Sequence, residues 1–149
     1  MGTADGINDE DWEHLQDLAA RVCGTLGSEE EQASRREFCA CLDQMERKYG
    51  PLPSLLSTRG DFSEDYEEKE DLLHRAYAAA IAIGDRKNSL YIAHSLTELY
   101  MAELLSLEDA RTWLDRLDTH LVETFDSHYA DDAKKFRKQL KKLDSIGNP

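Results

Sequence analysis

The sequence predicts an all-α protein of antiparallel helical hairpins, with about six helices in a single domain over residues 1–149. Apolar residues recur three and four positions apart along most of the chain, which is the spacing of one helix face. Helix-capping residues, glycines and prolines separate these segments at short intervals, and no segment alternates as a strand would. Short connections favour antiparallel neighbours, so successive helices are expected to pair. The termini, residues 1–8 and 145–149, are expected to be frayed.

The first helix is predicted to begin at Asn8 or Asp9, because either side chain can accept hydrogen bonds from the free amides of a helix start. Gly24 and Gly27 are expected to end it. Its apolar face consists of Trp12, Leu15, Leu18, Ala19, Val22 and Leu26.

A second helix is predicted from about Ser28 to Tyr49. Ser28 and Glu31 form a capping-box pattern at its start, and the Gly-Pro-Leu-Pro segment 50–53 stops it. Its apolar face consists of Phe38, Cys41, Leu42, Met45 and Tyr49.

Residues 52–61 are expected to hold a short helix that begins at Pro53 or Ser54. The next long helix opens at residues 63–64 and is broken at 84–85, a Gly-Asp pair.

The helix from about Lys87 to Leu105 is apolar around most of its circumference, so it is expected to be the central, most buried helix. A further helix opens at Ser106, and the last is capped by Asp126 or Ser127. We expect the long helices to pair in chain order as three hairpins, or in an equivalent offset pairing.

Charge is distributed unevenly along the chain. The net charge is -13, yet residues 134–149 hold six basic residues and one acid, which leaves 30 acids, 12 bases and a net charge of -18 for residues 1–133. Phosphate backbones repel such a surface, whereas a basic protein partner is steered toward it. We therefore expect a basic protein as partner and no nucleic acid.

No membrane span or export signal is predicted. The longest apolar run, residues 76–83, is far shorter than the roughly 20 residues that cross a bilayer. The N-terminus carries acids where a signal peptide has positive and then apolar residues, which favours a cytoplasmic protein. Three cysteines do not form a disulfide framework in that compartment.

Motifs that carry chemistry are absent: the sequence shows no phosphate-binding glycine loop, metalloprotease helix, paired CxxC or nucleophile elbow. His94 and Glu98 stand one turn apart, but two ligands are too few for a metal, and an ordinary polar contact is favoured. We predict no cofactor, no metal and no catalytic residue. An enzyme whose side chains converge only in three dimensions, such as a metal-dependent hydrolase, stays an alternative.

The segments 76–88 (AYAAAIAIGDRKN), 89–100 (SLYIAHSLTELY) and 107–114 (LEDARTWL) resemble a tetratricopeptide repeat of the longer variety. Thr97 stands where that family usually has glycine. The resemblance implies a right-handed stack of hairpins, and places Ala93, Leu96 and Tyr100 against Ala110, Leu114 and Leu117. It also implies a ligand groove, toward which the following residues turn: Tyr91, His94, Glu98 and Met101. The alternative is that this helix is covered on all sides and that these residues belong to the core.

A second candidate surface is the acidic segment 61–71, which has seven acids against one base, Lys69. Acids beyond the first turn of a helix repel one another, so they are suited to meet basic groups of a partner, although capping and solvation explain part of the pattern. The acids are Asp61, Glu64, Asp65, Glu67, Glu68, Glu70 and Asp71.

Two functions of a binding protein follow. The block 52–100 is similar to helical immunity proteins of bacterial toxin systems, which implies an inhibitor that masks a basic toxin enzyme by imitating its substrate's charge. The alternative is a tetratricopeptide-like adaptor or secretion chaperone that holds a peptide segment in its groove.

Overall fold

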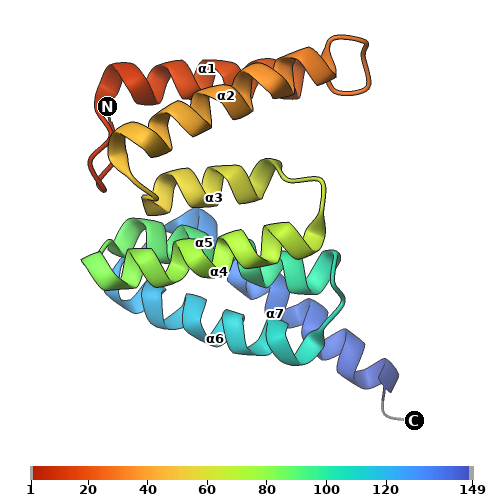
Figure 1. The fold of residues 1–149 in the computed structure, drawn as a ribbon. Helices are drawn as coiled ribbons and strands as arrows, with labels where there is room; N and C mark the ends of the chain where they lie inside the picture. Colours follow the sequence, from red (N-terminus) through yellow and green to blue (C-terminus); the bar gives the residue numbers. More distant parts are fainter. Residues whose placement is uncertain (1, 148–149) are drawn as a thin grey trace.

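The computed structural model describes residues 2–147, and over that range the chain forms seven helices and no strand (Figure 1). The predicted all-α class and the antiparallel packing of neighbouring helices are confirmed. The helices are α1 (Asp9–Gly24), α2 (Glu31–Tyr49), α3 (Pro53–Phe62), α4 (Tyr66–Ile83), α5 (Arg86–Ala102), α6 (Leu107–Glu123) and α7 (Ser127–Gly147).

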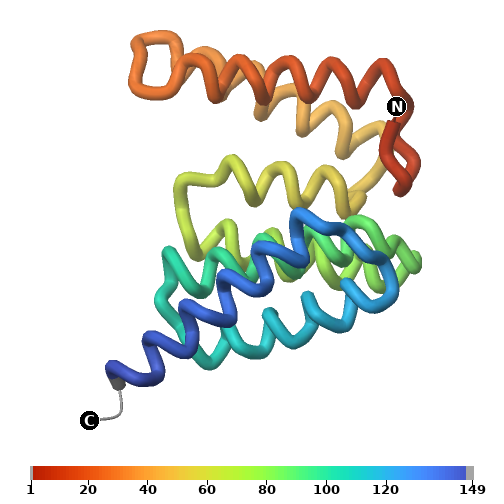
Figure 2. Tube along the Cα trace, turned by 180° about the vertical axis from the view of Figure 1, so that it is seen from behind, coloured from red at the N-terminus to blue at the C-terminus, as the bar shows by residue number. Residues whose placement is uncertain are grey.

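The hairpins follow the offset alternative to the predicted pairing, because the short helix α3 takes part as a partner. The tightest packing is between α5 and α6 and between α3 and α4, and α1 pairs with α2. The short helix α3 is therefore a full hairpin partner, and α7 crosses α5 and α6 on the side that faces the viewer in Figure 2. As expected for the central helix, α5 packs against helices on several sides, and ten of its residues are buried.

Local capping explains where most helices begin. The side chain of Asn8 accepts a hydrogen bond from the Asp11 amide at 2.8 Å, as predicted for the start of α1. Gly84, with a φ of 69°, ends α4, and the Asp85 carboxylate accepts from the Asn88 amide to start α5. The break at residues 84–85 was predicted, and glycine suits it because it favours left-handed backbone. The capping of α5 by Asp85 was not predicted, although a short acidic side chain satisfies free amides.

Some predicted boundaries are wrong. The helix expected from Ser28 begins only at Glu31, whose carboxylate accepts from the Gly27 amide at 2.8 Å instead of forming a capping box. The helix expected to reach Leu105 ends at Ala102, because Leu105 adopts a φ of 52° that turns the chain toward α6. Asp65, rather than residues 63–64, caps α4.

The N-terminal segment, expected to fray, packs against the body of the protein. The Thr3 amide donates to the Ile7 carbonyl, and the Ile7 side chain is only 2% exposed. At the other end α7 is helical through Gly147, so residues 145–147 are also ordered as helix, while residues 148–149 lie outside the described range.

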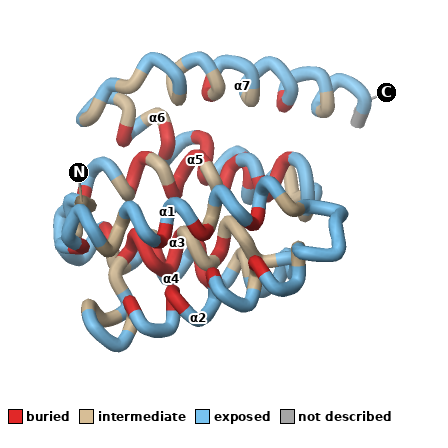
Figure 3. The backbone as a smooth tube through the Cα atoms, turned by 90° about the horizontal axis from the view of Figure 1, so that it is seen from above, coloured by how far each residue is buried: buried red, intermediate tan, exposed pale blue. Residues whose placement is uncertain are grey.

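Two apolar cores meet at α3. One is formed by α1, α2 and the N-terminal segment together with Leu55, and the other by α4 to α7 together with Leu56. These adjacent leucines are 0% and 4% exposed, because α3 is buried on two faces rather than one. Seen from above, buried residues follow α3, α4 and α5, whereas the outer face of α7 is exposed (Figure 3).

A glycine permits the close approach of α3 to α4. A Cβ atom added at Gly60 meets the side chain of Leu73 at 3.3 Å and Leu72 Cβ at 3.4 Å, and both leucines belong to the core. The contact fixes the distance between the two helices.

We predict that Gly60→Val destabilises the fold by about 1–3 kcal/mol, because a branched side chain overpacks the α3–α4 contact. Urea unfolding followed by circular dichroism measures the change. Gly24→Val is the matched control, since a Cβ there meets nothing within 4 Å, and its effect stays within about 0.5 kcal/mol. Equal effects of the two variants would show that α3 and α4 do not depend on this contact.

Candidate functional site

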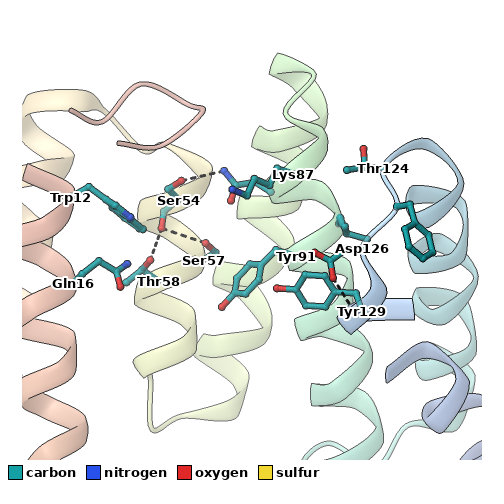
Figure 4. Close-up of a pocket in the computed structure, with 13 residues that line it drawn as sticks. Trp12, Gln16, Ser54, Ser57, Thr58, Lys87, Tyr91, Thr124, Asp126 and Tyr129 are labelled. Atoms are coloured by element: carbon teal, nitrogen blue, oxygen red, sulfur yellow. Dashed lines mark hydrogen bonds between the residues drawn. The ribbon is translucent and has the colours of Figure 1, made fainter. Parts of the chain in front are cut away.

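One side of the helical stack is hollowed into a groove lined by α1, α3, α5 and the start of α7 (Figure 4). Two adjoining cavities of about 470 and 500 Å³ make up the groove, and they share Tyr91 and Tyr129. Thus α1, α3 and α5, the first helices of the three hairpins, all contribute residues to the face that carries the groove. The lining residues considered below are Trp12, Gln16, Ser54, Ser57, Thr58, Asp61, Lys69, Lys87, Asn88, Tyr91, His94, Ser95, Glu98, Glu103, Asp126, His128 and Tyr129.

A chain of hydrogen bonds joins the N-terminal segment, the start of α3 and the start of α5 beside the groove. The Asp5 carboxylate accepts from the Ser54 amide at 2.7 Å and from the Ser54 hydroxyl at 2.9 Å. The Asn88 amide group donates to the Ser54 hydroxyl at 3.1 Å and to the Asp85 carboxylate at 2.7 Å. The N-terminal segment therefore caps α3 from a distance and ties it to the start of α5.

Asp61 and Tyr91 join α3 to α5 within the groove. The Tyr91 hydroxyl donates a hydrogen bond to the Asp61 carboxylate. Burial raises the pKa of Asp61, and the hydrogen bond from Tyr91 opposes this shift. Burial, followed by the nearby Asp61 charge, raises the pKa of Tyr91, so this phenol stays protonated and remains the donor.

His94 connects the groove to α7. Its Nε2 lies 2.8 Å from the Asp132 carboxylate, and its ring lies 4.7 Å from the ring centroid of Tyr129 and 5.6 Å from that of Phe136. The side chain of His94 is 11% exposed. This contact positions the first turns of α7, and with them Tyr129, at the edge of the groove.

Three of the four residues predicted from the repeat resemblance lie together. Tyr91, His94 and Glu98 all line the second cavity. Met101 does not, and its predicted orientation toward the groove is wrong: it is 4% exposed and belongs to the core of α4 to α7. The groove continues past the end of α5, where Leu99 and Glu103 also line it, whereas Met101 packs into the core.

Of the seven acids in segment 61–71, only Asp61 lines the groove. The others have local contacts or are exposed. Glu64 pairs with Arg35 at 2.9 Å, Asp65 caps α4, and Glu68 accepts from Ser63 at 3.3 Å. Glu70 accepts from the Tyr100 hydroxyl, Asp71 lies 3.8 Å from Arg75, and Glu67 is exposed near the start of α4. Several of these acids therefore also serve local structure.

The contributions of α1, α7 and, apart from Asp61, α3 were not predicted. A signal existed in α3, where Ser57, Thr58 and Asp61 stand three, four and seven positions after Ser54. Such spacing places them on one face. Trp12 of α1 and Tyr129 of α7 carried no comparable signal, because each also fits an apolar stripe of its own helix.

The groove offers a polar and aromatic surface suited to binding. In the described part of the chain no three His, Cys, Asp or Glu side chains are grouped so as to hold a metal ion. No helix of residues 2–147 is both long and apolar enough to cross a membrane. Comparison with known proteins identified no matching family model, curated protein or solved structure.

We predict that Asp61→Asn stabilises the protein by about 1 kcal/mol at pH 7, because the amide keeps the oxygen that accepts from Tyr91 and removes a desolvated charge. The folded-state pKa of Asp61 is raised, so below the unfolded value of about 3.9 the carboxyl is neutral in both states and adds no penalty. As pH rises through the folded-state pKa, the wild-type protein loses stability relative to the variant.

Urea unfolding at pH 4 and pH 7 measures this difference. The matched control is Asp115→Asn on the exposed side of α6, which removes the same charge without removing a buried one. A stabilisation of Asp61→Asn that is the same at both pH values, or that Asp115→Asn reproduces, would contradict the assignment of a desolvation cost to Asp61.

Proposed function

We propose that this chain is a non-catalytic, acidic binding protein that holds a segment of a basic protein partner in the groove. The observation that carries the proposal is the groove itself, to which α1, α3 and α5 each contribute a polar or aromatic face. Its length across successive hairpins suits an extended or helical segment better than a small molecule. This is the adaptor-type function.

The hairpin order supports a tetratricopeptide-like stack as part of the same proposal. Residues 93, 96 and 100 of α5 and residues 110, 114 and 117 of α6 are all buried, as the resemblance implies for a hairpin interface. Most of the residues that line the groove come from the first helix of each hairpin, which is where the resemblance places the ligand surface. We propose a right-handed stack of this type.

Charge favours a basic partner. Residues 1–133 carry a net charge of -18, and the second cavity is lined by Asp61, Glu98 and Glu103 against one lysine, Lys69. Long-range attraction raises the association rate of a basic segment, and the polar and aromatic lining then supplies short-range contacts.

An inhibitor of a basic enzyme, such as the immunity protein of a bacterial toxin system, is the second candidate. The exposed acids outside the groove favour it, including Asp9, Glu10 and Glu13 on α1 and Glu67 on α4. In this version the acidic surface covers the enzyme's active site, and the groove is not required for recognition.

Affinity purification from the source cells, followed by mass spectrometry, tests the proposal with three forms of the tagged protein. Ser95→Trp fills the second cavity, and Thr119→Trp places the same side chain on the exposed face of α6. We expect wild type and Thr119→Trp to retain one basic protein at equal stoichiometry, and Ser95→Trp to lose at least about tenfold in affinity for it.

The outcome also separates the two candidates. A basic enzyme that is inhibited on binding, and that Ser95→Trp still binds with unchanged affinity, identifies the inhibitor and removes the groove from recognition. Equal losses in Ser95→Trp and Thr119→Trp, or the absence of any basic protein that binds at defined stoichiometry, would refute groove capture.

A further inference from the structure

The second cavity contains a carboxylate without a cationic partner. Asp61 accepts a hydrogen bond from Tyr91, but none of the ion pairs within residues 2–147 includes it. Ionised side chains removed from water are normally paired, so this site lacks the partner that its burial calls for.

The arginines nearest to Asp61 along α2 and α3 are committed elsewhere. Arg59 pairs with Asp43 at 2.8 Å and with Glu46 at 3.0 Å. Arg35 pairs with Glu31 at 2.8 Å and with Glu64 at 2.9 Å. Lys69 lines the cavity and lowers the cost of the Asp61 charge at longer range, without forming an ion pair with it.

Negative charge and aromatic rings surround the same space. Glu98 and Glu103 add two carboxylates to the lining, against Lys69 and the two histidines His94 and His128. The lining also includes two tyrosine rings, Tyr91 and Tyr129, whose centroids lie 6.4 Å apart in an edge-to-face arrangement.

A guanidinium group matches this combination better than an ammonium group does. It is planar, stacks on aromatic rings and donates several hydrogen bonds in a fixed fork that carboxylates accept. An ammonium group is a compact, strongly hydrated charge, and it loses more hydration on entering a partly buried aromatic site.

We infer that the second cavity takes the guanidinium group of an arginine side chain presented by the protein partner, with Asp61 and Glu98 as its acceptors. The inference rests on the proposed function, since it names the group that anchors the partner's segment in the groove. The groove would then select basic segments by one arginine rather than by net charge alone.

Nuclear magnetic resonance titration tests the inference with small probes. The probe is N-acetyl-arginine methylamide, its citrulline analogue is the neutral control of nearly equal shape, and its lysine analogue carries the same charge without the fork. We expect saturable shifts of the backbone amides of residues 61, 91 and 98 with the arginine probe. Its affinity should exceed that of the citrulline and lysine analogues by about fivefold or more.

Matched variants locate the binding. Asp61→Asn should weaken the arginine probe at least about tenfold, whereas Asp115→Asn, with the same change in net charge, should leave its affinity unchanged within about twofold. Asp61→Asn is expected to be the more stable protein, so a loss of binding is not a loss of fold.

Three results would overturn the inference: equal shifts with the citrulline analogue, equal or tighter binding of the lysine analogue, or equal weakening by Asp61→Asn and Asp115→Asn. Failure of the proposed function would be seen in a different measurement, the capture of the partner by the two variants. If Ser95→Trp abolishes capture of the partner and Asp61→Asn does not, the groove binds the partner without the arginine anchor. If neither variant affects capture, the groove is not the binding surface.

Discussion

The packing of α3 between two apolar cores is the constraint on which the rest of the structure depends. Leu55 belongs to the core beside α1 and α2, and Leu56 to the core that continues through α7. A ten-residue helix makes few backbone hydrogen bonds of its own and is marginal in isolation, so tertiary contacts must stabilise it. Gly60 allows α4 to approach closely, and Asp5 satisfies the amide of Ser54 at its start. Each of these contacts also fixes the separation of the two cores.

The groove follows from the same constraint. While α3 is buried on two faces, Thr58 and Asp61 lie on a third, opposite α1 and beside α5, and Arg59 pairs with acids of α2. A carboxylate in that position costs stability that an apolar or amide side chain would not, and no cation of the described chain offsets the cost as a direct ion pair. Proteins tolerate such groups where binding requires them. The energetics of Asp61 therefore agree with a site whose missing counter-charge comes from outside the chain.

Local signals in the sequence were sufficient to predict where most helices lie, but not which side chains contact one another across the fold. Asn8, Gly84 and Asp85 act within one turn of the chain, so their roles could be predicted from neighbouring residues alone. The bond between Asp5 and Ser54 joins residues 49 positions apart, and nothing in either neighbourhood encodes it. Met101 was placed wrongly because it lies at the edge of the helix face that lines the groove, where the core of α4 to α7 covers it. Three acids of segment 61–71, namely Glu64, Asp71 and Glu70, have partners in α2, α4 and α5, and composition alone does not encode these contacts.

The last helix completes the groove through contacts of opposite charge. Two ion pairs join α7 to α6: Arg137, from the Lys/Arg-rich segment 134–142, pairs with Asp118, and Asp144 near the end of α7 pairs with Arg111. Exposed pairs of this kind contribute little stability individually, but they orient the helix over α6. The partly buried contact between His94 and Asp132 then positions the first turns of α7, where Tyr129 forms the wall opposite Tyr91. Contacts of α7 with both α5 and α6 thus hold this wall of the groove in place, and Arg137 of the Lys/Arg-rich segment contributes to them.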